Sequence, residues 1–394
     1  MPFSKKSNLE NKIRILYIIH SLNIGGSEKV LIDSINGLDR NKYQAHIIAL
    51  SKFNSEKSIF RICKHPENVA ITYLDYHFQQ DYSLFGYLKV LLRAKSSFYL
   101  LDKIIDEISA FRPDIIHFHT GPRELRLKKF FAYNAIYIFT DHTLRITREE
   151  LGVFRTRLMS FIFRRLYSGF HVICVSLQIQ KNLLKLSVPD PPKKIMVLPN
   201  SVDTERFKKK SRLNFSEGLK AVYVSRIDNN KGHEELIRAW AGLNDIENKQ
   251  LFVVGPDHLN GKIQTLAHDL KCADSIIFTG SVSDTHAILE NCNLGVFPSH
   301  KEGLPLSLLE KMSMSLPMII SDIPELRSVC TNEYDCVFFK VGDAEDIEKT
   351  IRRLYQNRDL AEKISENARK TVEEKYSAHS ANKLLDDFYT SLLN

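Results

Sequence analysis

The sequence predicts an α/β protein with two doubly wound domains, each built on a parallel sheet. Three observations lead to this prediction. The chain has 394 residues, more than one compact core usually holds. Short, almost continuously apolar segments alternate with segments of helical character, as expected for buried parallel strands joined by helices. Near the middle, three prolines between residues 189 and 192 interrupt this alternation and suit a connector between domains.

Ten apolar segments are predicted to be strands, five before the connector and five after it. The first five are IRILYII (13–19), AHIIAL (45–50), DIIHFH (114–119), AIYIFTDH (135–142) and HVICVS (171–176). After KIMVLPN (194–200) come KAVYVSR (220–226), QLFVVG (250–255), SIIFTG (275–280), LGVFPS (294–299) and PMIISD (317–322). Strands of this composition are buried on both faces, and the helices between them are expected to cover those faces.

Composition excludes several classes of protein. Hydrophobic residues make up 43% and charged residues 26%, which is typical of a folded globular chain. The six cysteines show no C-x-x-C pair and no metal-like spacing with histidine, so neither a disulfide framework nor a zinc site is expected. The start, MPFSKKSNLENK, has no signal-peptide core, and no run reaches the ~18 apolar residues of a membrane span. We therefore expect a cytoplasmic protein, either soluble or peripheral on the inner face of the cell membrane.

Charge is distributed unequally along the chain. Residues 1–200 hold 30 Lys and Arg against 17 Asp and Glu, a net +13, which leaves 25 against 30, or −5, for residues 201–394. Much of the excess lies between residues 151 and 194, including FRTRLMSFIFRRLYSGF (154–170), where Arg155, Arg157, Arg164 and Arg165 interleave with apolar residues. This stretch is either a helix lying on an anionic membrane or a surface helix with an apolar inner face. Nucleic acid ranks last, because no nucleic-acid-binding motif is present and the second half is acidic.

Parallel sheets place their ligands at the carboxyl ends of the strands, so the loops that follow strands are the places to look for function. The loop after the first strand contains Gly25 and Gly26, where the backbone can approach a ligand, and Ser27, a candidate helix cap. A tight turn without a ligand is the simpler explanation of two glycines. The chain has no G-x-G-x-x-G and no G-x-x-x-x-G-K-[ST] motif, which removes the main support for a dehydrogenase or a P-loop NTPase.

Two further strand ends carry candidate residues. His117 and His119 lie two apart on one strand, so both point to the same face, with His119 nearer the carboxyl end. A hydrogen-bonded core histidine is the ordinary explanation, but the strand-end position favours function. Arg226 ends another strand and Lys231 follows before a helix, where a phosphate would approach helix amides. Solvated surface charge is the alternative for these two cations.

The stretch HKEGLPLSLLEKMSMSLP (300–317) places two glutamates around a helix start. Glu302 and Gly303 lie in the loop, Pro305 suits the first turn, and Glu310 lies more than one turn inside the helix. Free amides at the helix start would hold phosphate, whereas the carboxylates would repel it and suit neutral sugar hydroxyls. Together with the two cations, these residues describe a pocket for a nucleotide sugar.

These motifs, in their order along the chain, resemble those of the retaining GT-B glycosyltransferases of family GT4, which build bacterial polysaccharides and glycolipids. The matching elements are GGSE, the H-F-H strand end, LPNSVDTERF, VSRIDNNKG, the E-x7-E from Glu302 to Glu310, PMIISDIPELRSV and VGDAEDIEKTI. They span nearly the whole chain, and the E-x7-E in its EGLPLSLLE context is specific. The resemblance implies the GT-B fold, in which two Rossmann-like domains face a cleft. It assigns residues 1–192 and a returning C-terminal helix, 373–394, to an acceptor-binding domain, and residues 193–372 to a donor-binding domain.

The resemblance also implies roles for the candidate residues. It makes His119, Glu302, Lys231 and Arg226 catalytic, and it assigns donor binding to Gly25, Gly26, Arg226, Lys231, Glu302, Gly303, Leu304 and Glu310. The two cations would neutralise the donor diphosphate, Glu310 would bind the ribose, and Glu302 would hold the donor sugar with the backbone beside it. His119 would lie near the reacting carbon, and the glycine pair would border the diphosphate.

The activity implied is transfer of a hexose-type sugar, with retention, from a nucleoside diphosphate sugar to a glycan or lipid-linked acceptor, as in capsule or O-antigen synthesis. Uridine is the family's common nucleoside and guanosine a second possibility. No cofactor or metal is expected, and the chain lacks the D-x-D motif of the other main glycosyltransferase fold. One departure is Ser201 after Asn200, where the family usually has glycine. A nucleotide-sugar epimerase, a silent nucleotide-binding scaffold and a glycoside hydrolase stay open as alternatives.

Overall fold

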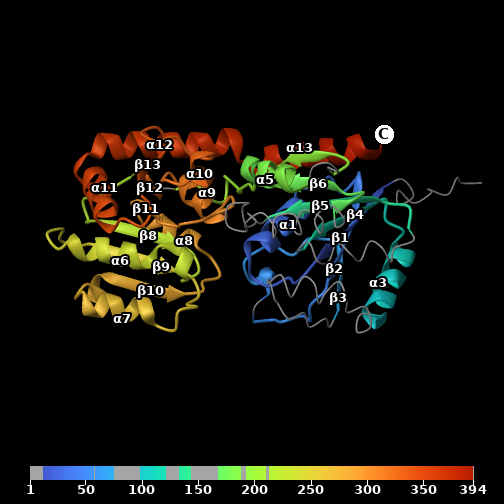
Figure 1. Cartoon of the computed structure of the whole chain (residues 1–394), viewed down its shortest axis with the longest axis horizontal. Coiled ribbons are helices and arrows are strands. Elements are labelled where there is room, and N and C mark those ends of the chain that lie inside the picture. The colour runs from blue at the N-terminus through green and yellow to red at the C-terminus, as the bar shows by residue number, and fades with distance from the viewer. Residues whose placement is uncertain are drawn as a thin grey trace, which may run out of the picture. The chain divides into compact units, whose positions relative to one another are not determined.

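The computed structural model describes residues 12–56, 58–74, 98–120, 133–142, 167–187, 192–209 and 213–393. The chain divides into two compact units. Unit 1 consists of residues 1–198 and 382–394, and unit 2 consists of residues 199–381. Each unit is an α/β domain with a parallel sheet of its own (Figure 1).

Unit 1 contains a seven-stranded parallel sheet with the order β3-β2-β1-β4-β5-β6-β7. Its strands are β1 (Ile13–Ile19), β2 (Tyr43–Ala49), β3 (Ala70–Tyr73), β4 (Ile115–His119), β5 (Ile136–Asp141), β6 (His171–Cys174) and β7 (Ile195–Val197). The helices described between them are α1 (Gly26–Asn36), the short 3-10 turn η1 (Ile59–Arg61), α3 (Phe98–Phe111) and α5 (Leu177–Ser187).

Both faces of this sheet are buried, which explains why its strands are continuous apolar runs. Along β1, Leu16 and Ile18 pack in a core on one face, while Ile15, Tyr17 and Ile19 pack in a second core. Successive side chains of a strand point to opposite faces, so a strand covered on both sides has no position left that faces solvent.

The last helix, α13 (Ala378–Leu393), completes the second of these cores. From Asn382 onward it belongs to unit 1, and its residues Phe388 and Tyr389 are buried there. Polar contacts add to this packing, because Asp386 accepts hydrogen bonds from Lys42 Nζ at 2.7 Å and from the Tyr43 hydroxyl at 2.6 Å. The C-terminal helix is thus part of the core of the first domain.

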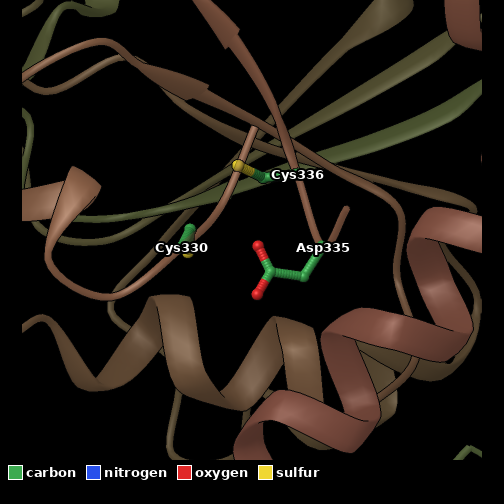
Figure 2. A group of neighbouring side chains, drawn as sticks. All are labelled: Cys330, Asp335 and Cys336. Carbon is green, nitrogen blue, oxygen red and sulfur yellow. The ribbon is translucent and has the colours of Figure 1, made fainter. Parts of the chain in front are cut away.

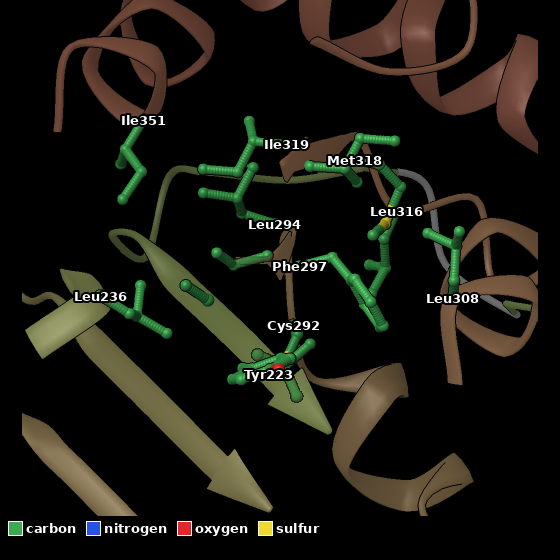
Figure 3. Packing of buried hydrophobic residues seen from close by; sticks show 14 of the residues in the cluster. Tyr223, Leu236, Cys292, Leu294, Phe297, Leu308, Leu316, Met318, Ile319 and Ile351 are labelled. Carbon is green, nitrogen blue, oxygen red and sulfur yellow. The ribbon is translucent and has the colours of Figure 1, made fainter. Parts of the chain in front are cut away.

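Unit 2 contains a six-stranded parallel sheet with the order β10-β9-β8-β11-β12-β13. Its strands are β8 (Lys220–Val224), β9 (Gln250–Val254), β10 (Ile276–Gly280), β11 (Leu294–Phe297), β12 (Met318–Ser321) and β13 (Val337–Phe339). Its helices and 3-10 turns are η4 (Asn229–Lys231), α6 (His233–Gly242), α7 (Lys262–Asp269), η5 (Ala273–Ser275), α8 (His286–Glu290), α9 (Leu306–Ser313), α10 (Pro324–Arg327), α11 (Ala344–Gln356) and α12 (Arg358–Lys375). Helix α6 packs beside α11 and α9 beside α12. Figure 3 shows part of the continuous core that these elements enclose.

The predicted fold class is confirmed, since both sheets are parallel and doubly wound. All ten predicted strands are present. The sequence analysis missed β3, β7 and β13, each of which forms one edge of a sheet. These three edge strands have only three or four residues and lack the long apolar run by which strands were recognised, whereas the fourth edge strand, β10, has five residues and was predicted.

The boundaries between the two units follow Leu198 and Ala381, whereas the predicted domain boundaries follow residues 192 and 372. Strand β7 pairs with β6, so the segment that follows the proline-rich connector still belongs to the first sheet. At the other end, Val202 forms a bridge with Ser377, which keeps all of α12 in unit 2.

Three features of the sequence lie outside the described residues. These are the N-terminal residues 1–11, the prolines Pro189 and Pro191 of the connector, and the four arginines Arg155, Arg157, Arg164 and Arg165. In the parts of the chain that the structure describes, no helix is long and apolar enough to cross a membrane.

Tyr389 provides a test of the packing of α13. Its hydroxyl lies 2.7 Å from His117 Nδ1 and 3.2 Å from the Tyr17 hydroxyl, and all three side chains are buried. Tyr389→Phe should lower the free energy of unfolding by about 1–2 kcal/mol, because it leaves His117 Nδ1 without this partner. Urea unfolding measures the change. Tyr334→Phe, at a residue that is 40% exposed, is the matched control and should change little; equal effects would contradict the assigned hydrogen bonds.

Candidate functional site

Each sheet reverses its strand order once, and the predicted residues lie at the reversals. In unit 1, β2 and β3 lie in succession on one side of β1, and the next strand along the chain, β4, lies on the other side of β1. In unit 2 the chain likewise returns from β10 to place β11 beside β8. At such a point the loops after two adjacent strands turn to opposite faces, which leaves room for a ligand. The predicted residues nearest these points are Gly25 and Gly26 after β1, His119 at the end of β4, Arg226 and Lys231 after β8, and Glu302 after β11.

In unit 2 the loops after β8 and β11 are joined by hydrogen bonds. The backbone N–H of His300 donates to the carbonyl of Asn230 at 3.0 Å. The Tyr223 hydroxyl donates to the carbonyl of Lys231 at 2.8 Å and lies 2.9 Å from Ser299 Oγ. The two loops therefore form one connected surface at the carboxyl edge of the sheet.

Gly232 makes the close approach of these loops possible. Its φ of 67° lies in the left-handed region, and a Cβ at this position would lie 2.0 Å from the carbonyl oxygen of Pro298. Gly232 is also the N-cap residue of α6 and brings no side chain to cap it. The first amides of α6 are therefore available to an anion at this edge.

The two cations of this edge differ in their surroundings. Lys231 Nζ lies 2.6 Å from Glu302 Oε1, and the two side chains are 17% and 11% exposed. Arg226 is exposed, and its guanidinium makes no hydrogen bond or ion pair with the residues that the structure describes. The predicted phosphate-binding lysine and the predicted sugar-binding carboxylate are thus paired with each other, while the arginine is free to meet a ligand.

Glu310 and the start of α9 are the remaining candidate features of unit 2. Pro305 is the N-cap residue of α9 rather than part of its first turn, and it provides no side-chain hydrogen bond to the helix amides. Glu310 is 6% exposed, and its Oε2 lies 3.5 Å from the Thr285 hydroxyl. The carbonyl of Leu304, between the two glutamates, accepts a hydrogen bond of 2.7 Å from Asn200 Nδ2.

This contact of Asn200 bears on the departure noted at the next residue. Ser201 is not among the residues with positive φ, so its backbone is in a region that any residue adopts. Serine in place of the family's usual glycine therefore strains nothing here. Asn200 keeps its side-chain contact to the loop that carries the glutamates.

In unit 1 the glycine loop is shaped by a carboxylate. Gly25 is the N-cap of α1 with φ −169°, an extended conformation, so Ser27 is not the cap that the sequence predicted. Instead, Ser27 Oγ donates to Glu28 Oε2 at 2.7 Å and Ser21 Oγ donates to Oε1 at 3.2 Å. A Cβ on Gly25 would lie 2.4 Å from Glu28 Oε2. A side chain at position 25 would displace this carboxylate, and burial raises the pKa of Glu28.

Three histidines cluster at the carboxyl ends of β4 and β5. The rings of His117 and His119 have centroids 4.4 Å apart, which confirms that they share a face. His117 lies 2.7 Å from both the Tyr389 and the Thr140 hydroxyls, so its two nitrogens are satisfied as in an ordinary core histidine. His119 Nδ1 lies 3.3 Å from His142 Nε2.

Burial keeps this histidine cluster neutral. It lowers the pKa of His117 to about 3 and that of His142 to about 4. The pKa of His119 falls well below its ordinary value, because burial and the two neighbouring imidazoles all disfavour its charge. At neutral pH each ring therefore offers one N–H donor and one bare nitrogen acceptor.

The structure brings the predicted residues together in two groups. Unit 2 holds Arg226, Lys231, Glu302, Gly303, Leu304 and Glu310, and unit 1 holds Gly25, Gly26 and His119. Sequence reasoning missed His142, although it ends the predicted strand segment 135–142 and directly follows β5. It also missed Lys311, which is fully buried beside Glu310. A lysine is rarely buried, and its position in a helix gives no sign of burial.

Two thiols and a carboxylate also lie close together in unit 2 (Figure 2). The ligand atoms of Cys330, Asp335 and Cys336 are within 4.8 Å of one another, the one such group found among the described residues. The Asp335 carboxylate already accepts hydrogen bonds of 2.7 Å from the Thr331 N–H and the Thr371 hydroxyl. Contact with Cys336 and burial raise the pKa of the Cys330 thiol. Because these hydrogen bonds organise the loop before β13, we interpret the cluster as a structural part of that loop.

Two family models match the chain in succession. The model described as Glycosyltransferase Family 4 matches residues 24–206, and the model described as Glycosyl transferases group 1 matches residues 204–371. The first match covers the glycine loop and the histidine cluster. The second covers both cations and both glutamates.

Individual proteins agree with these matches. The putative glycosyltransferase EpsD of Bacillus subtilis is 24% identical over 288 residues, which are 69% of this chain and 74% of EpsD. The capsular polysaccharide biosynthesis glycosyltransferase CapM of Staphylococcus aureus is 25% identical over 331 residues, 80% of this chain and 84% of CapM.

Among solved structures, Alr3699/HepE of Anabaena in complex with UDP superposes with a TM-score of 0.75 at 16% identity, covering 96% of this chain and 100% of that one. At this identity the likeness concerns the fold alone. With the two family matches it leads to one assignment. The chain belongs to the group 1 glycosyltransferases of family GT4 and is a glycosyltransferase with the GT-B fold.

Proposed function

We propose that this glycosyltransferase moves a hexose-type sugar, with retention, from a UDP-sugar to a glycan or lipid-linked acceptor in cell-surface polysaccharide synthesis. The observation that carries the proposal is the arrangement of charge at the β8–β11 reversal, where two cations and Glu302 lie on joined loops and Glu310 lies on the helix that follows. A diphosphate requires cations and amides, and a sugar requires hydrogen-bond acceptors. Uridine is the nucleoside bound in the Anabaena structure, and capsular polysaccharide is the product named for the Staphylococcus relative.

The diphosphate is bound by Arg226, Lys231 and helix amides. Arg226 is exposed and unpaired among the described residues, so binding costs it no existing contact. Lys231 moves part of its interaction from Glu302, 2.6 Å away, to the phosphate oxygens. The uncapped amides of α6 and α9 add partial positive charge at the same edge.

The carboxylates bind the hydroxyl groups of the donor. When Lys231 turns toward the diphosphate, Glu302 is released to accept hydrogen bonds from the sugar, beside the backbone of Gly303 and Leu304. Glu310 accepts hydrogen bonds from the ribose hydroxyls. Its burial favours this role, because a hydrogen bond to a charged and desolvated acceptor is stronger than one in water.

The reaction is a same-face displacement at the anomeric carbon. The bond from this carbon to the diphosphate oxygen breaks while the acceptor oxygen bonds on the same face, and the acceptor proton passes to the departing diphosphate. Arg226 and Lys231 stabilise the negative charge that develops on the leaving group, which is usually the largest catalytic contribution. No metal is required in this scheme.

Unit 1 supplies the neutral imidazole of His119 near the reacting carbon. Its pairing with His142 fixes which nitrogen is available to a hydroxyl group. Gly25 and Gly26 border the diphosphate in this proposal. Nothing lies within 4 Å of a Cβ built on Gly26, so the backbone there is open to close approach.

The acceptor is proposed to be held at an anionic membrane surface on the cytoplasmic side. Helix α5 supports this, because Leu177 and Leu184 are 54% and 37% exposed and the exposed Lys181 and Lys185 lie on the same helical face. Exposed leucines among lysines suit the surface of an anionic bilayer. The net charge of +13 in residues 1–200 would also favour binding to an anionic membrane.

Nucleotide binding tests the proposed function directly. In a thermal-shift comparison of UDP, GDP and ADP, UDP at 100 times its Kd should stabilise the protein by about 2.7 kcal/mol, or roughly 5–10 °C. Glu310→Gln should abolish most of this shift, because it removes the ribose-binding charge. Glu366→Gln, at an exposed glutamate of α12, is the matched control and should keep it. Equal shifts by all three nucleotides, or none, would reject the proposal.

Removal of a cation should slow the chemical step. Lys231→Ala is expected to lower kcat by about 100-fold, since it removes stabilisation of the leaving diphosphate. The measurement is release of UDP from UDP-sugar in the presence of an acceptor. Lys262→Ala removes an exposed lysine that pairs with Glu234 in the same unit and should leave the rate unchanged. Release of UDP at the wild-type rate by Lys231→Ala would refute the assigned role.

Flotation with phosphatidylglycerol vesicles tests the membrane contact. The protein should float with the vesicles at low salt and dissociate at high salt, because screening weakens the attraction between lysines and lipid headgroups. The double change Lys181→Glu and Lys185→Glu should reduce recovery. Lys262→Glu in unit 2 is the control and should float like the wild type. Failure of the wild-type protein to float at low salt would argue against the membrane-held acceptor.

A further inference from the structure

Two thiols and a carboxylate of unit 2 form a group that the scheme above does not use. Cys330 lies in the loop after α10, and Asp335 and Cys336 lead from this loop into β13. The three residues are buried, with exposed fractions of 3%, 2% and 0%. Their ligand atoms lie within 4.8 Å of one another, and the Asp335 carboxylate extends toward the two cysteines (Figure 2).

The carboxylate of this group is buried without an ion-pair partner among the residues that the structure describes. One oxygen of Asp335 accepts a hydrogen bond from the Thr331 N–H, and the other accepts one from the Thr371 hydroxyl, both at 2.7 Å. Each oxygen keeps a lone pair for a further contact. Buried carboxylates are ordinarily paired with a cation or bound to a metal, and hydrogen bonds of this kind orient carboxylates that bind metals.

A third sulfur atom lies beside the two thiols. The Cys330 thiol donates a weak hydrogen bond to Met312 Sδ at 3.7 Å, and Met312 is fully buried on α9. Tetrahedral zinc with bonds of about 2.3 Å holds two sulfur ligands about 3.8 Å apart. The spacing of these two sulfurs already fits, and the other ligand atoms, within 4.8 Å of one another, need to close by about 1 Å.

This set of donor atoms selects among metal ions. Ca²⁺ and Mg²⁺ take oxygen ligands, so two thiols disfavour them. Cu⁺ prefers sulfur ligands and gains little from a carboxylate, whereas Zn²⁺ binds thiolate and carboxylate together. We infer that Cys330, Asp335 and Cys336 bind a zinc ion, with Met312 Sδ at the fourth position. On binding, the two thiols release their protons to solvent and zinc takes their place, with no change of oxidation state.

The site joins three elements of unit 2. Cys330, Asp335 and Cys336 belong to the connection between α10 and β13, Met312 belongs to α9, and Thr371, which holds the carboxylate, belongs to α12. Strand β13 has three residues, forms an edge of the sheet and begins directly after Cys336. A zinc ion here fixes the start of this short strand against two helices. This role is independent of the nucleotide sugar.

Two other states of the group predict different behaviour. If Asp335 only organised the loop through hydrogen bonds, the group would bind no metal. If Cys330 and Cys336 formed a disulfide, both thiols would be consumed and zinc would have no sulfur ligands. A phosphine reductant, which keeps thiols reduced without binding zinc, separates the second state from the inference.

The test is metal binding by the full-length protein in such a reductant. Co²⁺, a spectroscopic substitute for zinc, should produce thiolate-to-cobalt charge-transfer absorption and the intense visible bands of tetrahedral cobalt. Zn²⁺ should abolish both signals when one equivalent per chain has been added. Zinc at about 100 times its Kd should raise Tm by roughly 5–10 °C, because it binds the folded site and not the unfolded chain.

Three variants identify the ligands. Cys330→Ser should remove most of the charge-transfer absorption and weaken zinc binding by about 100-fold, because a hydroxyl replaces a thiolate. Asp335→Asn should weaken it by about tenfold and keep the Tm of the zinc-free protein, since an amide can make both loop hydrogen bonds. Cys272→Ser is the matched control, because Cys272 is 4% exposed and donates to the Ala267 carbonyl elsewhere in unit 2. It should bind cobalt and zinc as the wild type does.

Each outcome bears on the inference. Loss of binding in Cys330→Ser and Asp335→Asn, with Cys272→Ser unchanged, supports the site. A reduced wild-type protein that shows no thiolate–cobalt absorption and no thermal shift with zinc overturns it. Equal zinc binding by the wild type, Cys330→Ser and Asp335→Asn places the ion elsewhere and rejects the assigned ligands. Equal weakening by Cys272→Ser would trace the effect to the fold of unit 2 and would also reject them.

Discussion

The structure depends on one constraint, which is that every strand of each sheet runs parallel to its neighbours. Parallel strands place all their carboxyl ends at one edge, and each must be reached by a crossover that covers a face of the sheet. Both faces are then buried, as the two cores on either side of β1 illustrate. The chain must also reverse its direction of growth once in each sheet, beside β1 and beside β8. The candidate residues gather at these two reversals because only there do the loops of adjacent strands separate.

Within unit 2 the site is a balance of charge. Lys231 and Glu302 form an ion pair at 2.6 Å. The Arg226 side chain has no partner among the described residues. Glu310 is buried, as is Lys311, the residue that follows it in the chain. Desolvating an ion pair is costly, and an anion of higher charge beside the pair would compete with Glu302 for Lys231. A diphosphate is such an anion. Under the proposed function, the pair separates when the donor binds, so that Lys231 contacts the diphosphate and Glu302 the sugar.

In unit 1, by contrast, burial keeps the candidate histidines uncharged. The histidines of β4 and β5 are kept neutral by desolvation, and His117 is tied by Tyr389 to the C-terminal helix. A helix from the end of the chain thus completes the core behind the strand that carries His119. Neutral imidazoles suit hydroxyl groups, whereas the cations of unit 2 suit phosphate. Under the proposed function, the two units would therefore contact different parts of the substrates.

The sequence by itself determined the central strands, the fold class and the residues at the strand ends, because continuous apolar runs and strand-loop-helix motifs are local patterns. It did not reveal the edge strands β3, β7 and β13, which are too short to carry such a pattern. Tertiary structure alone decided which side chains meet. The pairing of Lys231 with Glu302 joins residues 71 positions apart, and the contact of His117 with Tyr389 joins residues 272 apart. The burial of Lys311 was equally invisible, since whether a charge lies in water or in a core depends on what packs over it, and that is set by the whole fold.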